Sequence, residues 1–269
     1  MNRINRRALV VGAQGGVGRA VLTLLERTDA GRRLLGGLDA VVLADRVPAR
    51  AAAPLRGGVQ LPPVTIRSGG DLARLIQEHQ ITEVVDLSSL DTVECSQVCD
   101  GLGVDFLCTS VEEWAGHGPL PTDEAIARLL PPQRPAIERG SYLVGSGANP
   151  GLVNALVFEA LDAFASRVGV ASSADALELY AILITEEDTT IDLDDDGSTD
   201  EFAMTWSPWH CLEELFEPAA FVASNGRVRR LGHEPAACEY AARCGDRVIE
   251  GLAVPHEEVV TLARRFPSV

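Results

Sequence analysis

Hydrophobic residues near the start of the chain change their spacing at a group of glycines. The segment RRALVVGAQGGVGRAVLTLLER opens with an apolar run, and after the glycines its apolar residues recur every three to four positions. The first pattern is typical of a buried strand, and the second is typical of an amphipathic helix. We therefore predict a strand, a tight turn and a helix.

The same alternation continues along the first half of the chain. LDAVVLADR is followed by VTIRSGG and by DLARLIQEHQ, a helix that we expect Asp71 to cap; TEVVDLSSL, SQVCDGLG and VDFLCTS come next. Strands that alternate with helices predict right-handed crossovers and a parallel sheet. The proline-rich RLLPPQRPAIERG closes this region, and SYLVGSGANPG begins another strand and turn.

These patterns predict an α/β fold with two domains. Residues 1–146 are expected to form a Rossmann-type, doubly wound parallel sheet that binds NAD, and residues 147–269 a partial α+β domain for substrate and catalysis.

The glycines have the spacing of a nucleotide-binding turn. Gly12, Gly15 and Gly18 form GxxGxxG, in which glycine allows positive φ and lets the backbone approach a pyrophosphate at the helix N-terminus. The next strand ends in Asp45, where an acid would bind the adenosine ribose hydroxyls. Asp45 favours NAD over NADP, although the neighbouring Arg46 leaves NADP open, and an empty α/β turn is the alternative.

Composition and charge narrow the function. The chain has 269 residues, 46% of them hydrophobic, which is enough for a large buried core. A net charge of −16 disfavours nucleic acids and anionic membranes and attracts small cations. No apolar run reaches the length of a membrane span, and the basic N-terminus leads directly into a strand, so we expect a cytoplasmic protein.

Cysteine and histidine spacing predicts no metal site. The six cysteines include no CxxC pair, which fits reduced thiols in the core, and the five histidines include no HExxH pair. Neither GxSxG nor a P-loop occurs, which argues against acyl hydrolysis and nucleoside triphosphate chemistry.

Residues 182–207, ILITEEDTTIDLDDDGSTDEFAMTWS, contain nine carboxylates. Asp192, Asp194, Asp196 and Gly197 imitate the start of an EF-hand loop, but position twelve is Ala203, where calcium requires a bidentate Glu. We therefore interpret DLDDDG as a solvated acidic loop that can steer cations over long range.

Several motifs in order resemble the homospermidine synthase branch of the saccharopine dehydrogenase-like reductases. They are VVDLSSLDTVECSQVCDGLGVDFLCTSVEEW, GSGANPGLVNALV, ITEEDTT, EFAMTWS and AVPHEEVVTLARRF, which together cover most of the chain. The resemblance implies a retained NAD and the joining of two putrescine molecules into homospermidine with loss of ammonia. In that chemistry, NAD takes a hydride from the amine-bearing carbon, a second amine attacks the imine, and NADH returns the hydride.

The resemblance also implies roles for individual residues. Glu112 would hold the outer amino end of the substrate, Glu186 would bind or deprotonate the inner amine, and Glu214 would be a further amine ligand. Trp206 would provide a cation–π face, Asn149 with Pro150 would shape the site at the nicotinamide, and His256 would close the pocket together with the substrate-binding Glu258. The expected cofactor contacts are Gly12, Gly15, Gly16, Val17, Gly18, Asp45, Ser88, Ser89, Thr109, Ala148 and Pro150.

Some of these residues also have a plain structural interpretation. Ser88 and Ser89 could be turn formers, Glu186 and His256 could be strand-end groups in solvent, and Trp206 could belong to the core. Ser207 followed by Pro208 is typical of a helix start, which would make Glu214 an ordinary exposed helix residue.

Two departures from the family pattern leave alternatives open. Members extend well past the His-x-Glu segment, whereas this chain ends at Val269, as expected of a fragment, of a shortened relative completed by a partner subunit in a homodimer, or of an inactive relative. Around SPWHCLEEL and DLDDDG the residues also differ from the family. A saccharopine-type oxidoreductase acting on a secondary amine and an NAD-binding protein without turnover therefore remain alternatives, although the former would need basic residues for a substrate carboxylate.

Overall fold

The computed structural model describes residues 5–47, 55, 58–113, 120–133, 136–187, 207–216, 221–231, 239–267 and 269. The chain forms two compact units. The first unit comprises Met1–Leu120 and Ala127–Leu152, and the second comprises Pro121–Ile126 and Val153–Val269.

A six-stranded sheet organises the first unit, and all its strand pairs are parallel. The spatial order is β3-β2-β1-β4-β5-β6. This order reverses direction between β1 and β4, and in such sheets ligands bind at the carboxyl ends of the strands beside that switch point. The Rossmann-type prediction is confirmed. The strands are β1 (Arg7–Val11), β2 (Ala40–Ala44), β3 (Val59–Gln60), β4 (Glu83–Asp86), β5 (Asp105–Cys108) and β6 (Tyr142–Leu143).

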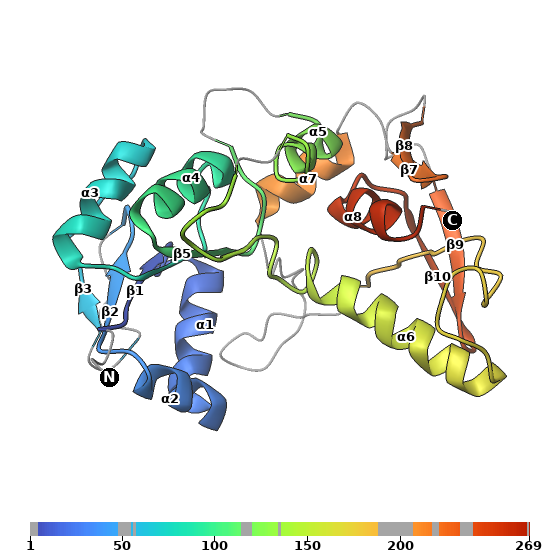
Figure 1. The fold of residues 1–269 in the computed structure, drawn as a ribbon, viewed down its shortest axis with the longest axis horizontal. Helices are drawn as coiled ribbons and strands as arrows, with labels where there is room; N and C mark the ends of the chain where they lie inside the picture. Colours follow the sequence, from blue (N-terminus) through green and yellow to red (C-terminus); the bar gives the residue numbers. More distant parts are fainter. Residues whose placement is uncertain are drawn as a thin grey trace, which may run out of the picture. The chain divides into compact units, whose positions relative to one another are not determined.

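Helices cover both faces of this sheet because its strands are apolar on both sides. Leu9 and Val11 of β1 pack with α3 (Gly69–His79) and α4 (Thr92–Leu102), while Val10 between them packs with α1 (Gly16–Arg27). Figure 1 shows α3 and α4 on one side of the strands and α1 and α2 (Asp29–Gly36) on the other.

The glycine turn brings α1 against the end of β1 with no side chain between them. Gly12 has a φ of +77°, and a Cβ there would lie 2.4 Å from the carbonyl oxygen of Leu87. A Cβ on Gly18 would lie 2.1 Å from the carbonyl oxygen of Gly12. Glycine is therefore required at both positions, as the spacing predicted.

Two local predictions were wrong. Helix α3 begins at Gly69 with Ser68 as its N-cap, and Asp71 lies in the first turn, where its N–H donates to Ser68 Oγ at 3.3 Å. The strand expected in VTIRSGG is replaced by β3 at Val59–Gln60, a few residues earlier. Val64 is still hydrogen-bonded to the residue that follows β2: its N–H donates to the carbonyl of Asp45 at 2.9 Å.

The buried cysteines serve packing. Cys95, Cys99 and Cys108 lie in the core between the sheet, α3 and α4. Burial raises the pKa of Cys99 and of Cys108 to about 12, so both thiols stay protonated at neutral pH. This agrees with the interpretation of these three residues as structural thiols.

The second unit combines helices with two antiparallel hairpins. One hairpin joins β7 (Phe221–Ser224) to β8 (Arg227–Arg230) through Asn225 and Gly226, which both have positive φ, and the other joins β9 (Glu239–Cys244) to β10 (Arg247–Leu252). The helices are α5 (Thr122–Ala127), α6 (Leu152–Val168), α7 (Pro208–Phe216) and α8 (Glu257–Arg265).

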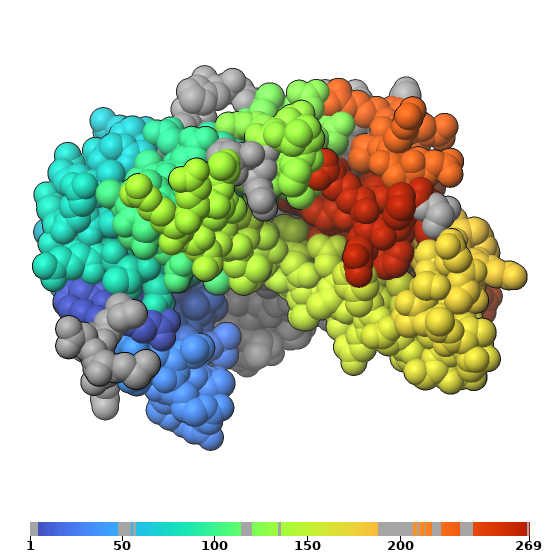
Figure 2. Space-filling model, viewed as in Figure 1, coloured from blue at the N-terminus to red at the C-terminus, as the bar shows by residue number. Residues whose placement is uncertain are grey.

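Helix α8 is central to the packing of this unit. It contacts β7 and β8, and the ring of Phe266 just after it lies 5.5 Å from the ring of Phe158 on α6. Figure 2 shows the red surface of α8 beside the yellow-green surface of α6. Helix α7 starts at Pro208, and the N–H of His210 donates to Ser207 Oγ at 3.4 Å, as the sequence predicted. Among the described residues, no helix has both the length and the apolarity that a membrane crossing needs.

Substituting Gly18 by Ala is expected to destabilise the first unit by roughly 1–3 kcal/mol, because the new methyl group overlaps the Gly12 carbonyl. Gly16→Ala is the matched control, since a Cβ at Gly16 meets no atom within 4 Å. Urea unfolding of the two variants measures the difference. Equal midpoints for both would contradict the close backbone contact.

Candidate functional site

In the first unit, the glycine turn and Asp45 meet at the carboxyl edge of the sheet. Asp45 follows β2, and its Oδ2 accepts the N–H of Gln14 at 2.8 Å, while its Oδ1 accepts the N–H of Val47 at 3.1 Å. These bonds hold the carboxylate beside the turn. Gly15, Gly16 and Val17 are exposed there.

The residues present fit a dinucleotide. The hydrogen bond from Arg19 N–H to the Gly15 carbonyl, at 3.0 Å, is the first of α1, so the preceding amides of the helix start face outward. Such amides bind phosphate oxygens, and the missing side chains at Gly15 and Gly16 allow close approach. Asp45 then offers a carboxylate for ribose hydroxyls.

Asp86 and Glu112 place two acids at the same edge. Asp86 ends β4 and accepts the N–H of Ser88 at 3.0 Å and its hydroxyl at 2.6 Å. Burial raises the pKa of Asp86 to about 6; the Ser88 bonds oppose this increase, and the charge of Glu112 adds to it. Glu112 is held by its N–H, which donates to Thr92 Oγ1 at 2.9 Å. Ser89 is exposed.

The loop GSGANPG also lies at the end of these strands. Ser146 N–H donates to the carbonyl of Cys108 at 2.8 Å, and Gly147 N–H donates to the carbonyl of Pro150 at 2.8 Å. A Cβ on Gly147 would lie 3.3 Å from the carbonyl oxygen of Thr109. The loop that carries Ala148, Asn149 and Pro150 is thus closed against Thr109, and its Asn149–Pro150 bond is cis.

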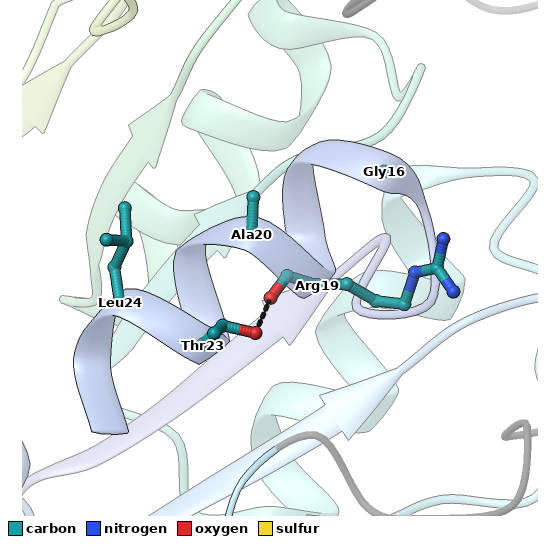
Figure 3. Close-up of a pocket in the computed structure, with 5 residues that line it drawn as sticks. All are labelled: Gly16, Arg19, Ala20, Thr23 and Leu24. Carbon is teal, nitrogen blue, oxygen red and sulfur yellow. Dashed lines mark hydrogen bonds between the residues drawn. The ribbon is translucent and has the colours of Figure 1, made fainter. Parts of the chain in front are cut away.

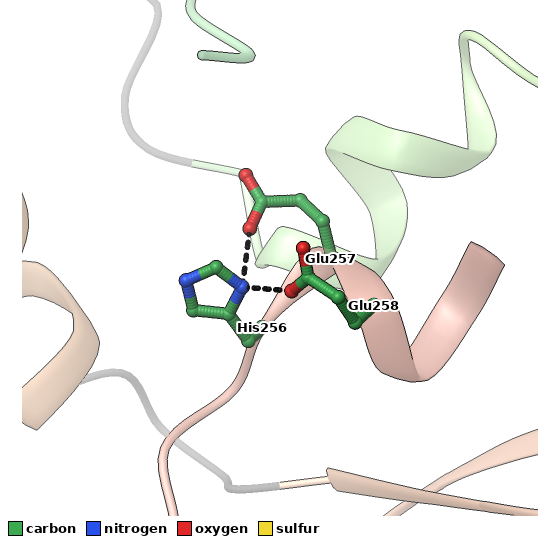
Figure 4. A group of neighbouring side chains, drawn as sticks. All are labelled: His256, Glu257 and Glu258. Carbon is green, nitrogen blue, oxygen red and sulfur yellow. Dashed lines mark hydrogen bonds and ion pairs between the residues drawn. The ribbon is translucent and has the colours of Figure 1, made fainter. Parts of the chain in front are cut away.

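In the second unit, three carboxyl side chains gather around His256. His256 is the N-cap of α8, and its Nδ1 contacts Oε2 of Glu257 at 3.0 Å and Oε2 of Glu258 (Figure 4). On the other side of the ring, Nε2 lies 3.8 Å from Oε1 of Glu214 on α7. Donor atoms at this spacing also fit a metal ion, but a ring proton shared between two carboxylates already accounts for the contacts.

Burial and charge act in opposite directions in this group. Burial lowers the pKa of His256, but its hydrogen bonds to Glu257 and Glu258 and their charges outweigh burial and raise it to about 10. Burial raises the pKa of Glu214 to about 7; the charge of His256 opposes the increase, and those of Glu257 and Glu186 add to it. At neutral pH the cluster therefore holds a protonated imidazole beside a carboxyl group that can gain or lose a proton.

Similarity to known proteins is low in sequence but extends over most of the chain. No protein-family model matches the chain. A homospermidine synthase from Mesorhizobium japonicum is 25% identical to it, over 94% of this chain and 60% of the relative. The chain resembles homospermidine synthases.

A solved structure agrees at the level of the fold. The crystal structure of the homospermidine synthase from Legionella pneumophila in complex with NAD matches 99% of this chain and 62% of its own, with a TM-score of 0.73 and 17% sequence identity. The chain thus spans about three-fifths of the length of each of these homospermidine synthases. The match extends through the regions that carry both groups of polar residues described above.

The remaining predicted site residues have different outcomes. Glu186 is exposed and lies at 182–187, where no strand forms, in contrast to the predicted strand end; the neighbouring Leu183 is 86% exposed and packs into no sheet. The charge of Glu186 adds to the increase in the pKa of Glu214, which is caused mainly by burial. His256 is a helix cap and largely buried, which contradicts the plain interpretation as a solvent-exposed strand end. Trp206 and DLDDDG lie outside the described residues.

Two residues of these groups escaped the sequence analysis. Asp86 could have been found, because an acid at the end of an apolar strand beside a nucleotide turn lies at the switch point. Glu257 gives a weaker signal. The letters PHEEVV do not show which of the two acids faces the histidine, because the backbone geometry at the helix start is what directs both side chains toward the ring.

A pocket on α1 is a separate feature. It is lined by Gly16, Arg19, Ala20, Thr23 and Leu24, which Figure 3 shows along one helix face. Thr23 Oγ1 donates to the Arg19 carbonyl at 2.6 Å. The lining offers a single charged group, the Arg19 guanidinium, and no acid–base pair, so we place no chemistry there.

The Glu214→Gln variant is expected to lose less folding stability than wild type when the pH is raised. The pKa of Glu214 in the folded protein, about 7, exceeds its ordinary value of 4.5, so its stabilising contribution is complete below pH 4.5 and is lost as pH rises through 7. The variant lacks this titration, and we expect it to keep on the order of 1–2 kcal/mol more of its stability between pH 5 and pH 8.

Thermal melting of wild type and variant at these two pH values measures the effect. Glu250→Gln, at an exposed position of β10, is the control and should follow wild type. A parallel pH dependence of wild type and Glu214→Gln would contradict a raised pKa at Glu214.

Proposed function

We propose that this chain has NAD-dependent homospermidine synthase-type activity: it condenses two diamines, with putrescine as the substrate, and releases ammonia through an imine intermediate. The observation that carries the proposal is the buried excess of negative charge around His256. Glu214, Glu257 and Glu258 are three carboxylates around one imidazolium, which leaves two negative charges when Glu214 is ionised.

This imbalance favours a cationic substrate. A diamine carries two positive charges at neutral pH, and desolvated carboxylates bind such a dication strongly. A saccharopine-type substrate would bring a carboxylate, which this cluster would repel. Within the part of the chain that the structure describes, the ion pairs of Glu214, Glu257 and Glu258 all involve His256, and their partners include no Arg or Lys.

NAD is the proposed cofactor, which the amides at the start of α1 and the carboxylate of Asp45 would hold. When bound, it would supply reversible hydride transfer at the amine-bearing carbon of the first diamine. In the substrate, loss of the hydride and a proton gives an iminium, the second amine adds to its carbon, and ammonia leaves. Reduction of the new imine completes a secondary amine, so that two diamines give one triamine and one ammonia with no net oxidation.

The residues of the chain would bind, orient and move protons. Glu214, with a pKa of about 7, suits acceptance of a proton from an attacking ammonium. Glu258 has a buried Oε1 without a hydrogen-bond partner among the described residues, and an amine N–H would satisfy it. Glu112 and Asp86 would hold an amino end near the nicotinamide, beside Asn149 and Pro150. Glu186 and Trp206 complete the proposed amine contacts.

The wider assignments are proposals of the same kind. We propose an NAD-binding domain over residues 1–146, a substrate domain over residues 147–269, a cytoplasmic location and a homodimer. Cofactor contacts are proposed for Gly15, Gly16, Val17 and Gly18 and, beyond the turn, for Ser88, Ser89, Thr109 and Ala148.

Purified protein incubated with NAD and putrescine is expected to form homospermidine, detected by mass spectrometry. Glu214→Gln should lower kcat/KM by about 100-fold or more, because it removes the proton acceptor, whereas Glu250→Gln should match wild type. Absence of product from wild type that binds NAD would overturn the proposal in favour of a saccharopine-type reductase or an inactive relative.

Asp45→Asn is expected to weaken NAD binding by about tenfold and to raise the ratio of NADP to NAD affinity, because the carboxylate that binds the ribose and repels a 2′-phosphate is lost. Titration calorimetry with both nucleotides provides the measurement. Asp29→Asn, an exposed acid of the same unit, is the control. An unchanged preference in Asp45→Asn would exclude Asp45 from the ribose site.

A further inference from the structure

We propose that Glu257 is a positioning residue for His256: its carboxylate holds the Nδ1 edge of the imidazole, so that Nε2 points to Glu214 and Oε1 of Glu258 stays available to a substrate amine. The inference rests on the proposed function, because it assigns a part of the same amine site to a further residue.

The backbone at the start of α8 creates this arrangement. His256 is extended, with φ −147° and ψ 152°, while Glu257 and Glu258 are the first two helical residues. The chain therefore turns at His256, and both acid side chains reach back to its ring (Figure 4). Acids in the first turn are also favoured by the helix dipole, so the helix itself stabilises them there.

The single proton that Nδ1 of His256 can donate distinguishes the roles of Glu257 and Glu258. Nδ1 carries at most one proton, yet it contacts Oε2 of both Glu257 and Glu258. Glu258 has 4% of its side chain exposed, and its other oxygen, Oε1, lacks a partner among the described residues. Leaving a buried carboxylate oxygen unsatisfied is unfavourable, so Glu258 is the acid with unused capacity for an ammonium. Glu257 also contacts the ring through Oε2, at 3.0 Å, but neither of its oxygens is among the buried, unsatisfied atoms of the described residues.

Charge on every side of the ring supports an imidazolium in this position. Glu257 and Glu258 face it from α8, Glu214 faces it from α7, and the charges of His210 and Glu186 act on this group. Burial alone would raise the pKa of Glu257, but the hydrogen bond and charge of His256 outweigh it, so the pKa lies below its usual range. An ionised Glu257 keeps His256 protonated, which leaves proton acceptance to Glu214.

The test measures the titration of His256 by NMR of protein labelled with ¹⁵N-histidine, with the His256 signals assigned from their absence in His256→Gln. In wild type, the titration midpoint should lie well above the ordinary 6.5. Glu257→Gln should lower it by about one pH unit or more, a tenfold loss of proton affinity, and Glu257→Asp should lower it less. Glu250→Gln should leave it unchanged.

Activity provides a second measurement. If homospermidine forms, Glu257→Gln should shift the pH profile of kcat toward lower pH and leave NAD affinity at the wild-type value, whereas a purely structural effect would lower activity equally at all pH values.

The proposal is overturned if His256 of wild type titrates at an ordinary value, a result that requires no variant to fold. It is also overturned if folded Glu257→Gln keeps the wild-type midpoint. Because NMR reports on the ring without turnover, a normal titration with product formed rejects the positioning role alone. A raised, Glu257-dependent midpoint without product rejects the proposed reaction alone.

Discussion

The contact between the backbones of Gly12 and Gly18 determines where α1 can lie. A methyl group at Gly18 would overlap the Gly12 carbonyl, so the absence of two side chains allows the helix to start directly after β1. That start leaves the first amides of α1 at the carboxyl edge of the sheet, on the turn that Asp45 holds through the N–H of Gln14. The nucleotide site proposed for the first unit depends on this edge, because a helix displaced by even one side chain would move its amides away from Asp45.

Both units bury carboxyl groups whose ionisation is unfavourable. Asp86 in the first unit and Glu214 in the second have pKa values of about 6 and about 7, mainly because burial removes water from the charged form. Such groups carry a cost in folding at neutral pH, which a bound cation would offset. A diamine fits this requirement, and a proton acceptor with a pKa near neutrality fits the condensation that we propose.

Prediction from sequence succeeded where one local rule decides the structure. The strand, glycine turn and helix at residues 7–27, the acid after β2 and the Ser207–Pro208 helix start follow from side-chain size, φ preference and capping, and the structure agrees with each. It failed where two local signals compete. Ser68 takes the cap position instead of Asp71 because the helix begins three residues earlier, and no strand forms at residues 182–187, where Glu186 was interpreted as a strand-end group.

The sequence by itself therefore determined the class of the first unit, the glycine turn between β1 and α1 and the acidic character of the chain, since these depend on residue type and on spacing along the chain. Only the tertiary structure decided which acids act together. Glu214 lies more than forty positions before His256, and Glu257 differs from Glu258 by which oxygen atoms already have a partner. Such differences arise from burial and from the direction of side chains after the chain folds, and no pattern of residue types along the sequence encodes them separately.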